Sequence, residues 1–233
     1  LAEEKKKKLK KDKKEKDNEE GDSDKESNDD KKIILTYNDK TEQLCDYMKI
    51  DNNVCFCFNE EKFLSFSSKN FGVEIQVDGS YKYIGSASKL PLYIVPITED
   101  YWNIIVNDEN DYLPYLKDLY YSFEEFHSIG GIGYCIVDNI VPPLSNEVVL
   151  SICISTIISK QSHRLFMKTH PALLKCGLAS ACGYCYVHHC IKEKIIPEIT
   201  CNTENSNGIR IGCKLGFIPT AIIPNLNWSY SLS

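Results

Sequence analysis

The residues best suited to chemistry lie between Leu165 and Ser180, where an apolar run leads through a glycine turn into a helix-forming stretch. Pro171 cannot donate a hydrogen bond to a strand and disfavours helix in the residue before it, so we expect the strand to end there. Gly177 allows a tight turn, and the first N–H groups of the helix that follows have no partner within it. With the positive end of the helix dipole and the ammonium group of Lys175, these N–H groups predict a cradle for a phosphate-like anion.

Cysteine and histidine residues form a second candidate cluster further along the same helix. Cys182 and Cys185 have the spacing of a zinc-binding pair, and His188, His189 and Cys190 follow them. All five residues lie on one predicted helix, which cannot surround a tetrahedral ion, and structural zinc sites normally use two separated pairs. We therefore interpret the 11 cysteines of the chain as small buried hydrophobic residues in a reducing compartment, and we expect no metal.

Hydrophobic patterning predicts the elements that must position the cradle. The central strand covers 165–167, the helix after the cradle continues to about residue 194, and further strands are expected over 131–137, 147–158, 218–223 and 228–232. In the N-terminal half the pattern predicts helices over 38–48 and 111–126, a strand over 54–58, an edge or crossing strand over 92–95, and a hairpin over 71–84. These elements predict the α/β class, with a mixed, largely antiparallel central sheet flanked by helices.

Several short motifs follow one another in a fixed order around the cradle. They are Thr169-His170-Pro171, Lys175-Cys176-Gly177-Leu178-Ala179, Pro197, Asn205 and Lys214-Leu215-Gly216-Phe217. This ordered set resembles the core of the GNAT superfamily of acyl-CoA-dependent N-acyltransferases, over residues 165–217 and, with the flanking strands, over 130–233. The sequence departs from the family pattern at three positions. Leu174 replaces an Arg or Gln, Gly208 replaces a Ser, and Gly212 stands where a tyrosine general acid is often found.

The resemblance implies a function and a set of site residues. It implies a GNAT-like fold and direct transfer of an acetyl group from acetyl-CoA to an amine acceptor, either a small molecule or a peptide. The implied cofactor-binding residues are Met167, Lys168, Thr169, Lys175, Cys176, Gly177, Leu178, Ala179, Ser180 and Asn205. The strand would pair with the pantetheine arm and polarise the thioester carbonyl near Lys168, while the cradle would bind the pyrophosphate. Cys176 is not expected to be a nucleophile, because the superfamily does not form an acyl-enzyme.

Direct transfer also requires a group that accepts the proton of the amine. Glu147, Glu198 and His170 are the candidates, Glu198 because it lies on the strand after the helix and His170 because it ends the central strand beside the cradle. All three are also residue types common at surfaces and helix caps. The missing family side chains leave an alternative open, in which the chain keeps the fold as a CoA-binding or protein-interaction scaffold without catalysis.

Composition divides the chain into three regions. Residues 1–32 contain twelve Lys and twelve acidic residues, which predicts a disordered, low-complexity tail. Residues 33–129 form an α+β part and a candidate acceptor-binding half, although the helical spacing of its aromatic residues is more typical of a core. Residues 130–233 form the GNAT-like core.

Charge and hydropathy limit the partners. The formal net charge of −6 belongs to residues 33–233, so we do not expect nucleic-acid binding apart from a role of the Lys-rich segment 5–16. No apolar run is long enough to span a membrane, and no signal peptide opens the sequence. We therefore expect a cytoplasmic protein, or a nuclear one if the Lys-rich segment acts as an import signal.

Overall fold

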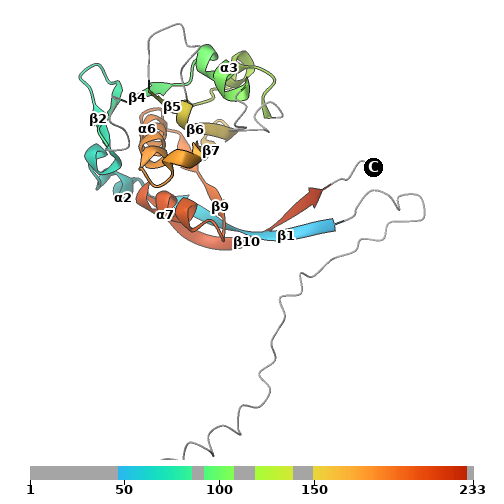
Figure 1. Cartoon of the computed structure of the whole chain (residues 1–233). Helices are drawn as coiled ribbons and strands as arrows, with labels where there is room; N and C mark the ends of the chain where they lie inside the picture. Colours follow the sequence, from blue (N-terminus) through green and yellow to red (C-terminus); the bar gives the residue numbers. More distant parts are fainter. Residues whose placement is uncertain (1–46, 86–91, 108–118, 139–148, 230–233) are drawn as a thin grey trace, which may run out of the picture. The chain divides into compact units, whose positions relative to one another are not determined.

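The computed structural model describes residues 47–85, 92–107, 119–138 and 149–229 (Figure 1). Residues 50–225 form one compact unit, and the candidate site lies within it. The predicted tail over residues 1–32 and the candidate base Glu147 lie outside the described residues.

A seven-stranded sheet forms the centre of this unit, with its strands in the order β2-β3-β4-β5-β6-β7-β8. The strands are β2 (Val73–Ile75), β3 (Tyr81–Tyr83), β4 (Tyr93–Pro96), β5 (Gly133–Val137), β6 (Val149–Ile158), β7 (Ser162–Thr169) and β8 (Ile196–Glu198). Every neighbouring pair is antiparallel except β7 and β8, which are parallel. The predicted α/β class with a mixed, largely antiparallel sheet is therefore confirmed.

Helices cover both faces of this sheet. Successive side chains of a strand point to opposite faces, so one strand contributes to the core on each side. In β5, Ile136 belongs to the core beneath α6 (Leu178–Lys192), which lies on one face. The neighbouring Val137 belongs to a second core, beneath α3 (Glu99–Asn107) and α5 (Phe123–Ser128) on the other face (Figure 1). The sheet is thus the middle of three layers, and the predicted cradle lies at the N-terminus of α6, in the layer on one face.

The cysteines of α6 are buried against the sheet. Cys182, Cys185 and Cys190 of α6 and Cys153 of β6 are all 0% exposed. Burial raises the pKa of each of these thiols, which stay protonated and uncharged. Their interpretation as small buried hydrophobic residues is confirmed, whereas Cys57 and Cys176 are exposed.

The two parallel strands are paired over only part of their length. The register of β7 with β8 ends where Arg164 lies opposite Glu198, and β7 then continues along β6 to Thr169. β8 ends at Glu198, and the chain forms β9 (Thr200–Asn202), which pairs with β1 (Tyr47–Phe58) in a second sheet ordered β10-β1-β9. The parallel strands therefore diverge after Arg164 and Glu198.

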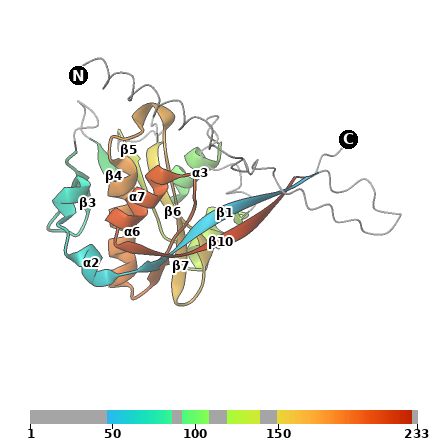
Figure 2. The same cartoon turned by 90° about the horizontal axis from the view of Figure 1, so that it is seen from below.

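Five further elements are described. They are α2 (Glu60–Leu64), η1 (Ser68–Phe71), η3 (Pro171–Leu173), α7 (Ser206–Lys214) and β10 (Phe217–Ser229). Asn205 caps α7, because its Oδ1 atom accepts a hydrogen bond of 2.9 Å from the N–H of Gly208. α7 packs beside α6 (Figure 2).

Two predictions for the N-terminal half are changed by the structure, and a third is narrowed to one of its two alternatives. Residues 47 and 48, predicted to end a helix, lie in strand β1, because pairing within the second sheet outweighs their helical spacing; residues 38–46 lie outside the description. Of the helix predicted over 111–126, residues 111–118 lie outside the description, and residues 120–122 are not helical. Ser122 caps a separate helix, α5, through a 3.1 Å bond from the N–H of Glu125. Residues 92–95 are predicted as an edge or a crossing strand, and the structure excludes the edge position, because β4 pairs on both sides, with β3 and β5.

Two predicted strand pairs, the hairpin over 71–84 and the closing strands, can be compared with the structure. The hairpin predicted over 71–84 is confirmed as β2 and β3. The two closing strands predicted around Pro224 are one strand, β10, as far as residue 229. Because β10 is an outer strand of its sheet, the missing N–H of a proline need not remove a ladder hydrogen bond.

Candidate functional site

The N-terminus of α6 opens onto a cavity of about 310 Å³. β7 and the loop after it form one side, the first turn of α6 forms the floor, and α7 forms the opposite side. The lining residues are Thr169, Leu173, Leu174, Lys175, Gly177, Leu178, Ala179, Ser180, Asn207, Arg210, Ile211 and Lys214. Six of the ten residues predicted to bind the cofactor are in this set. Of the other four, Met167 and Lys168 lie on β7 just before the lining residue Thr169, Cys176 lies in the turn before α6, and Asn205 caps α7.

The first turn of α6 has the features expected of an anion cradle. Gly177 is its N-cap residue, with a φ of 86° in the left-handed region, and no side chain caps the helix. The first N–H groups of any helix have no acceptor within it, and here they belong to Leu178, Ala179 and Ser180, which all line the cavity. A Cβ atom at Gly177 would meet no atom within 4 Å, so the space beside the turn is open.

Three basic residues surround the same cavity, namely Lys175, Arg210 and Lys214. Arg210 Nη2 donates a hydrogen bond of 3.2 Å to Oδ1 of Asn207. The Nζ atom of Lys214 lies 4.9 Å from the centroid of the Phe71 ring, and burial lowers the pKa of this lysine. No Asp or Glu is among the residues that line the cavity. In a chain with a net charge of −6, this concentration of positive charge indicates an anionic ligand.

The loop between β7 and α6 is fixed by hydrogen bonds from several directions. The N–H of Leu173 donates to the carbonyl of His170 at 2.9 Å, and the N–H of Ala172 donates to Nδ1 of His170 at 3.2 Å. The hydroxyl of Tyr83, in β3, donates to the carbonyl of Cys176 at 3.1 Å. His170, one of the predicted bases, therefore caps η3 beside the cradle.

The family follows from a comparison of sequences. The sequence profile of the GNAT acetyltransferase family matches residues 87–222, which is more than half of the chain. The chain belongs to the GNAT acetyltransferase family. A search of curated protein sequences found no match.

Solved structures share the fold. A GCN5-related N-acetyltransferase-like protein from Streptococcus suis aligns with a TM-score of 0.55 and 16% identity, over 78% of this chain and 63% of that one. A Drosophila protein aligns with a TM-score of 0.52 and 7% identity, over 79% of this chain and 53% of that one. This GNAT chain therefore spans less than two thirds of either protein, and at these identities the likeness shows the fold alone.

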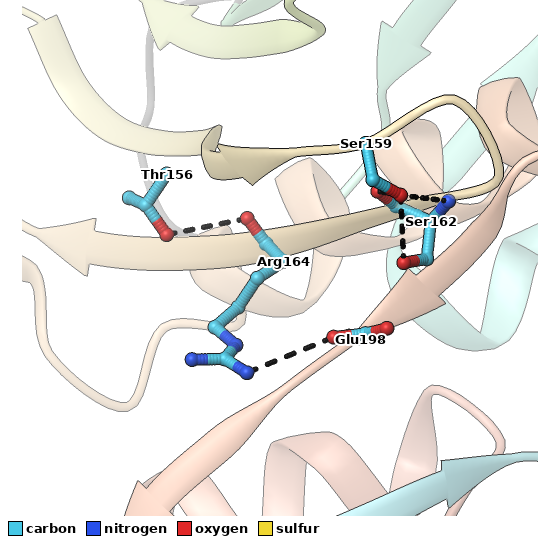
Figure 3. A network of polar contacts seen from close by, with 5 residues as sticks. All are labelled: Thr156, Ser159, Ser162, Arg164 and Glu198. Carbon is cyan, nitrogen blue, oxygen red and sulfur yellow. Dashed lines mark hydrogen bonds and ion pairs between the residues drawn. The ribbon is translucent and has the colours of Figure 1, made fainter. Parts of the chain in front are cut away.

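A second polar group lies where the parallel strands of the GNAT sheet diverge (Figure 3). Nη2 of Arg164 on β7 lies 3.7 Å from Oε2 of Glu198 on β8, and the two side chains are 37% and 44% exposed. The carbonyl of Arg164 accepts a hydrogen bond of 3.2 Å from Oγ1 of Thr156 in β6. The tight turn between β6 and β7 is closed by Ser159, whose hydroxyl donates to the carbonyl of Ser162 at 2.9 Å. Glu198, the other described candidate for the base, is thus a solvent-accessible carboxylate beside an arginine.

A buried polar network, which the sequence pattern does not predict, lies beneath the same strands. The hydroxyl of Ser155 lies 2.8 Å from the hydroxyl of Tyr186 and 3.4 Å from Nδ1 of His163. Ser155 and Tyr186 are 0% exposed and His163 is 3% exposed. Burial lowers the pKa of His163 and raises that of Tyr186, so both side chains are neutral. No local signal predicts this network, because its members come from β6, β7 and α6.

A second cavity, of about 360 Å³, lies towards the other end of α6. Tyr134 and His189 line it, and the tyrosine hydroxyl lies 2.8 Å from Nδ1 of His189. His189 is nine residues beyond Ser180, about 14 Å along the helix axis, so this cavity is separate from the cradle. Of the aromatic residues considered for an acceptor pocket, Phe123 lines this cavity, whereas Tyr101, Trp102, Tyr120 and Phe126 are buried in the core.

In the part of the chain that the structure describes, neither a cluster of metal ligands nor a membrane-spanning helix is present. There, no group of three or more His, Cys, Asp or Glu side chains is placed to hold a metal ion. None of the described helices is long and apolar enough to cross a bilayer.

Proposed function

We propose that this chain transfers an acetyl group from acetyl-CoA to an amine. The observation that carries the proposal is the cavity of about 310 Å³ at the N-terminus of α6, where helix N–H groups and three basic side chains surround one space. The pyrophosphate of coenzyme A would accept hydrogen bonds from these N–H groups. Lys175, Arg210 and Lys214 would balance the remaining phosphate charge. Asn205 would donate its amide N–H to the pantetheine arm, because its Oδ1 atom is already used in the cap of α7.

The length of β7 indicates where the thioester would lie. Pantetheine contains two amide units, and when extended it spans about four or five residues, roughly 15 Å. Counting back from Thr169 by this length reaches Arg164 and Leu165, where β8 leaves β7. Met167 and Lys168 lie between these points and would pair with the arm as an added strand does, with a main-chain N–H polarising the thioester carbonyl. The reacting carbon would therefore lie where the two parallel strands diverge.

Glu198 fits the role of base better than His170. Its carboxylate lies opposite Arg164 at the point of divergence and is 44% exposed, so that an amine can reach it. His170 follows the end of β7, six residues beyond Arg164 and about 20 Å away at the rise of a strand. The Nδ1 atom of His170 also already accepts the N–H of Ala172. We therefore assign the base to Glu198, with Arg164 orienting its carboxylate.

The proposed reaction balances without a tyrosine acid. The amine nitrogen forms a bond with the acyl carbon, the C–S bond breaks, and the proton taken by Glu198 is returned to the leaving thiolate, directly or through water. Gly212 stands where the family often has a tyrosine, and a Cβ atom there would lie 3.6 Å from the Phe56 ring and 3.7 Å from the Ile199 side chain. A glycine at this place is packed against two apolar side chains and offers no proton.

The acceptor is proposed as a primary amine of a small molecule or a peptide. The acidic balance of residues 33–233 weakly favours an acceptor that carries positive charge. We place the activity in the cytoplasm, or in the nucleus if the Lys-rich segment 5–16 is an import signal. The alternative is a scaffold that binds coenzyme A without transfer, and it rests on the family side chains missing at Leu174, Gly208 and Gly212.

Calorimetric titration with acetyl-CoA and with free CoA tests the first step. We expect saturable binding of both, because both carry the pyrophosphate. An assay of free thiol release over a panel of amines, amino acids and peptides then tests transfer. Absence of binding by either compound would reject the proposal, and binding without thiol release on any acceptor would favour the scaffold.

A further inference from the structure

The segment from Ser68 to Gly85 lies before the part of the chain that matches the GNAT family, which begins at residue 87. It comprises η1 and the strands β2 and β3, which form one end of the seven-stranded sheet and join its other strands through the pairing of β3 with β4. Two of its side chains contact opposite sides of the cavity at the N-terminus of α6. Through these contacts, a segment outside the family match affects the groups that surround the cavity.

The first contact is made by Tyr83. This side chain is 7% exposed, and its hydroxyl donates to the carbonyl of Cys176 at 3.1 Å. Two glycines make room for it. A Cβ atom at Gly72 would lie 3.3 Å from the Tyr83 ring, and one at Gly85 would collide with the Tyr83 hydroxyl.

The bond from Tyr83 controls a specific peptide group. The carbonyl of Cys176 and the N–H of Gly177 belong to one planar trans peptide and point in opposite directions. A hydrogen bond that fixes this carbonyl therefore also fixes the direction of the Gly177 N–H, next to the first N–H groups of α6. The hydroxyl of Tyr83 acts on the cradle through the main chain.

The second contact is made by Phe71. Its ring is 2% exposed, and it packs at 4.9 Å between centroids on Tyr184 of α6. On the side of α7, the Nζ atom of Lys214 lies 4.9 Å from the centroid of the same ring. The ring face attracts a cation at this distance, so it restricts where the ammonium group of this cavity residue can lie.

We infer that the segment Ser68–Gly85 is a positioning element of the CoA-binding cavity, with Tyr83 orienting the Cys176–Gly177 peptide and Phe71 orienting the ammonium group of Lys214. This inference rests on the proposed function, because it concerns the affinity of the cavity for the phosphates of coenzyme A. Neither residue touches the ligand or the reacting atoms. Both act on groups that do.

Tyr83→Phe tests the inference, and Tyr81→Phe is its matched control. Both tyrosines are in β3, and each loses one hydrogen-bonded hydroxyl. The hydroxyl of Tyr81 lies 2.8 Å from Nδ1 of His188 and contacts no residue that lines the cavity at the N-terminus of α6. In calorimetry we expect Tyr83→Phe to raise the Kd of acetyl-CoA by about 3- to 10-fold, the value for one lost hydrogen bond, and Tyr81→Phe to leave it unchanged. The Kd of 3′,5′-ADP, which lacks the pantetheine arm and keeps one of the two phosphates of the pyrophosphate, should rise as well.

Two further readouts separate positioning from a general loss of stability. In a ¹H–¹⁵N spectrum without ligand, the Gly177 amide resonance should move in Tyr83→Phe and stay in place in Tyr81→Phe. With any acceptor that is acetylated, the KM for acetyl-CoA should rise while kcat stays within about twofold, because only donor binding is affected. Phe71→Leu keeps an apolar side chain, removes the ring face, and should raise the Kd by about 2- to 5-fold.

The outcomes distinguish failure of the inference from failure of the proposed function. If the unmodified chain binds acetyl-CoA and Tyr83→Phe binds it as tightly as Tyr81→Phe does, the positioning role is overturned and the function stands. If the unmodified chain binds neither acetyl-CoA nor CoA, both fall. If Tyr83→Phe does not fold, an unchanged Kd in Phe71→Leu still overturns the role of the segment.

Discussion

Replacing Gly177 by Val tests the cradle, and the structure allows the result to be estimated. Gly177 has a φ of 86°, and a Cβ atom there would meet no atom within 4 Å, so a valine strains the backbone without a collision. The left-handed region costs a residue with a Cβ atom about 1–2 kcal/mol. For a domain of this size, that loss lowers the melting temperature by about 2–8 °C.

The effect on ligand binding should be larger, because the isopropyl group would stand beside the N–H groups that hold the pyrophosphate. Loss of two hydrogen bonds to phosphate oxygens costs about 3 kcal/mol, roughly 100-fold in Kd. At an acetyl-CoA concentration of about 100 times the original Kd, the ligand stabilises the unmodified chain by about 2.7 kcal/mol and the variant by only about 0.4 kcal/mol. Thermal unfolding with and without acetyl-CoA measures both effects.

Gly79→Val is the matched control for this experiment. Gly79 lies in the turn between β2 and β3, has a φ of 84°, and also has no atom within 4 Å of a Cβ position. Its replacement should lower the melting temperature without ligand by a similar amount and leave the ligand-induced shift as in the unmodified chain. If Gly177→Val shows the same ligand-induced shift as Gly79→Val, the reasoning that the N-terminus of α6 binds the cofactor is refuted.

Three further results are expected. Leu174→Arg restores a family side chain at an exposed position that lines the cavity. A new hydrogen bond to phosphate, less the side-chain entropy, gives a net gain of about 1 kcal/mol, which should lower the Kd of acetyl-CoA about fivefold in calorimetry. Weaker binding would contradict the proposed phosphate site. Glu198→Gln should lower kcat by about 10²- to 10⁴-fold while the Kd of acetyl-CoA stays the same, and an unchanged kcat would exclude Glu198 as the base. Because burial lowers the pKa of His163, the unfolded chain binds a proton below about pH 6.5 that the folded chain does not. The free energy of unfolding in urea should therefore fall as the pH falls, by at most about 1.4 kcal/mol per pH unit, and His163→Gln should reduce this slope.

The elements around the cradle could be predicted from the sequence because their signals are local. Pro171 ends the strand, Gly177 makes the turn, and the apolar run after it forms the helix, all within a few residues of one another. The predicted strand at 165–167 and helix to about residue 194 correspond to β7 and to α6, which ends at Lys192. The anchoring role of Tyr83 could not be predicted in this way, because 93 residues separate it from Cys176.

Errors arose where tertiary contacts override local pattern. Trp102 lies in α3, a helix that the sequence analysis did not predict, and its ring is 4% exposed between the sheet and α5. The burial of Ser155 was equally invisible, because a serine within a β-branched run gives no sign that a tyrosine and a histidine will meet it. Both cases depend on which elements become neighbours, and short-range periodicity does not contain that information.

The proposed site divides into a part formed by the main chain and a part formed by side chains. At the N-terminus of α6 the donors are N–H groups, so a changed side chain such as Leu174 alters the affinity for coenzyme A without removing the cradle. Where β7 and β8 diverge, the chemistry depends on one carboxylate, Glu198, and on the arginine beside it. Variants at the helix should therefore change the KM for acetyl-CoA, whereas variants at the divergence should change kcat and the choice of acceptor. If the same variants changed both KM and kcat, the helix N-terminus and the divergence would act as a single subsite, contrary to the roughly 15 Å that the extended pantetheine arm spans between them.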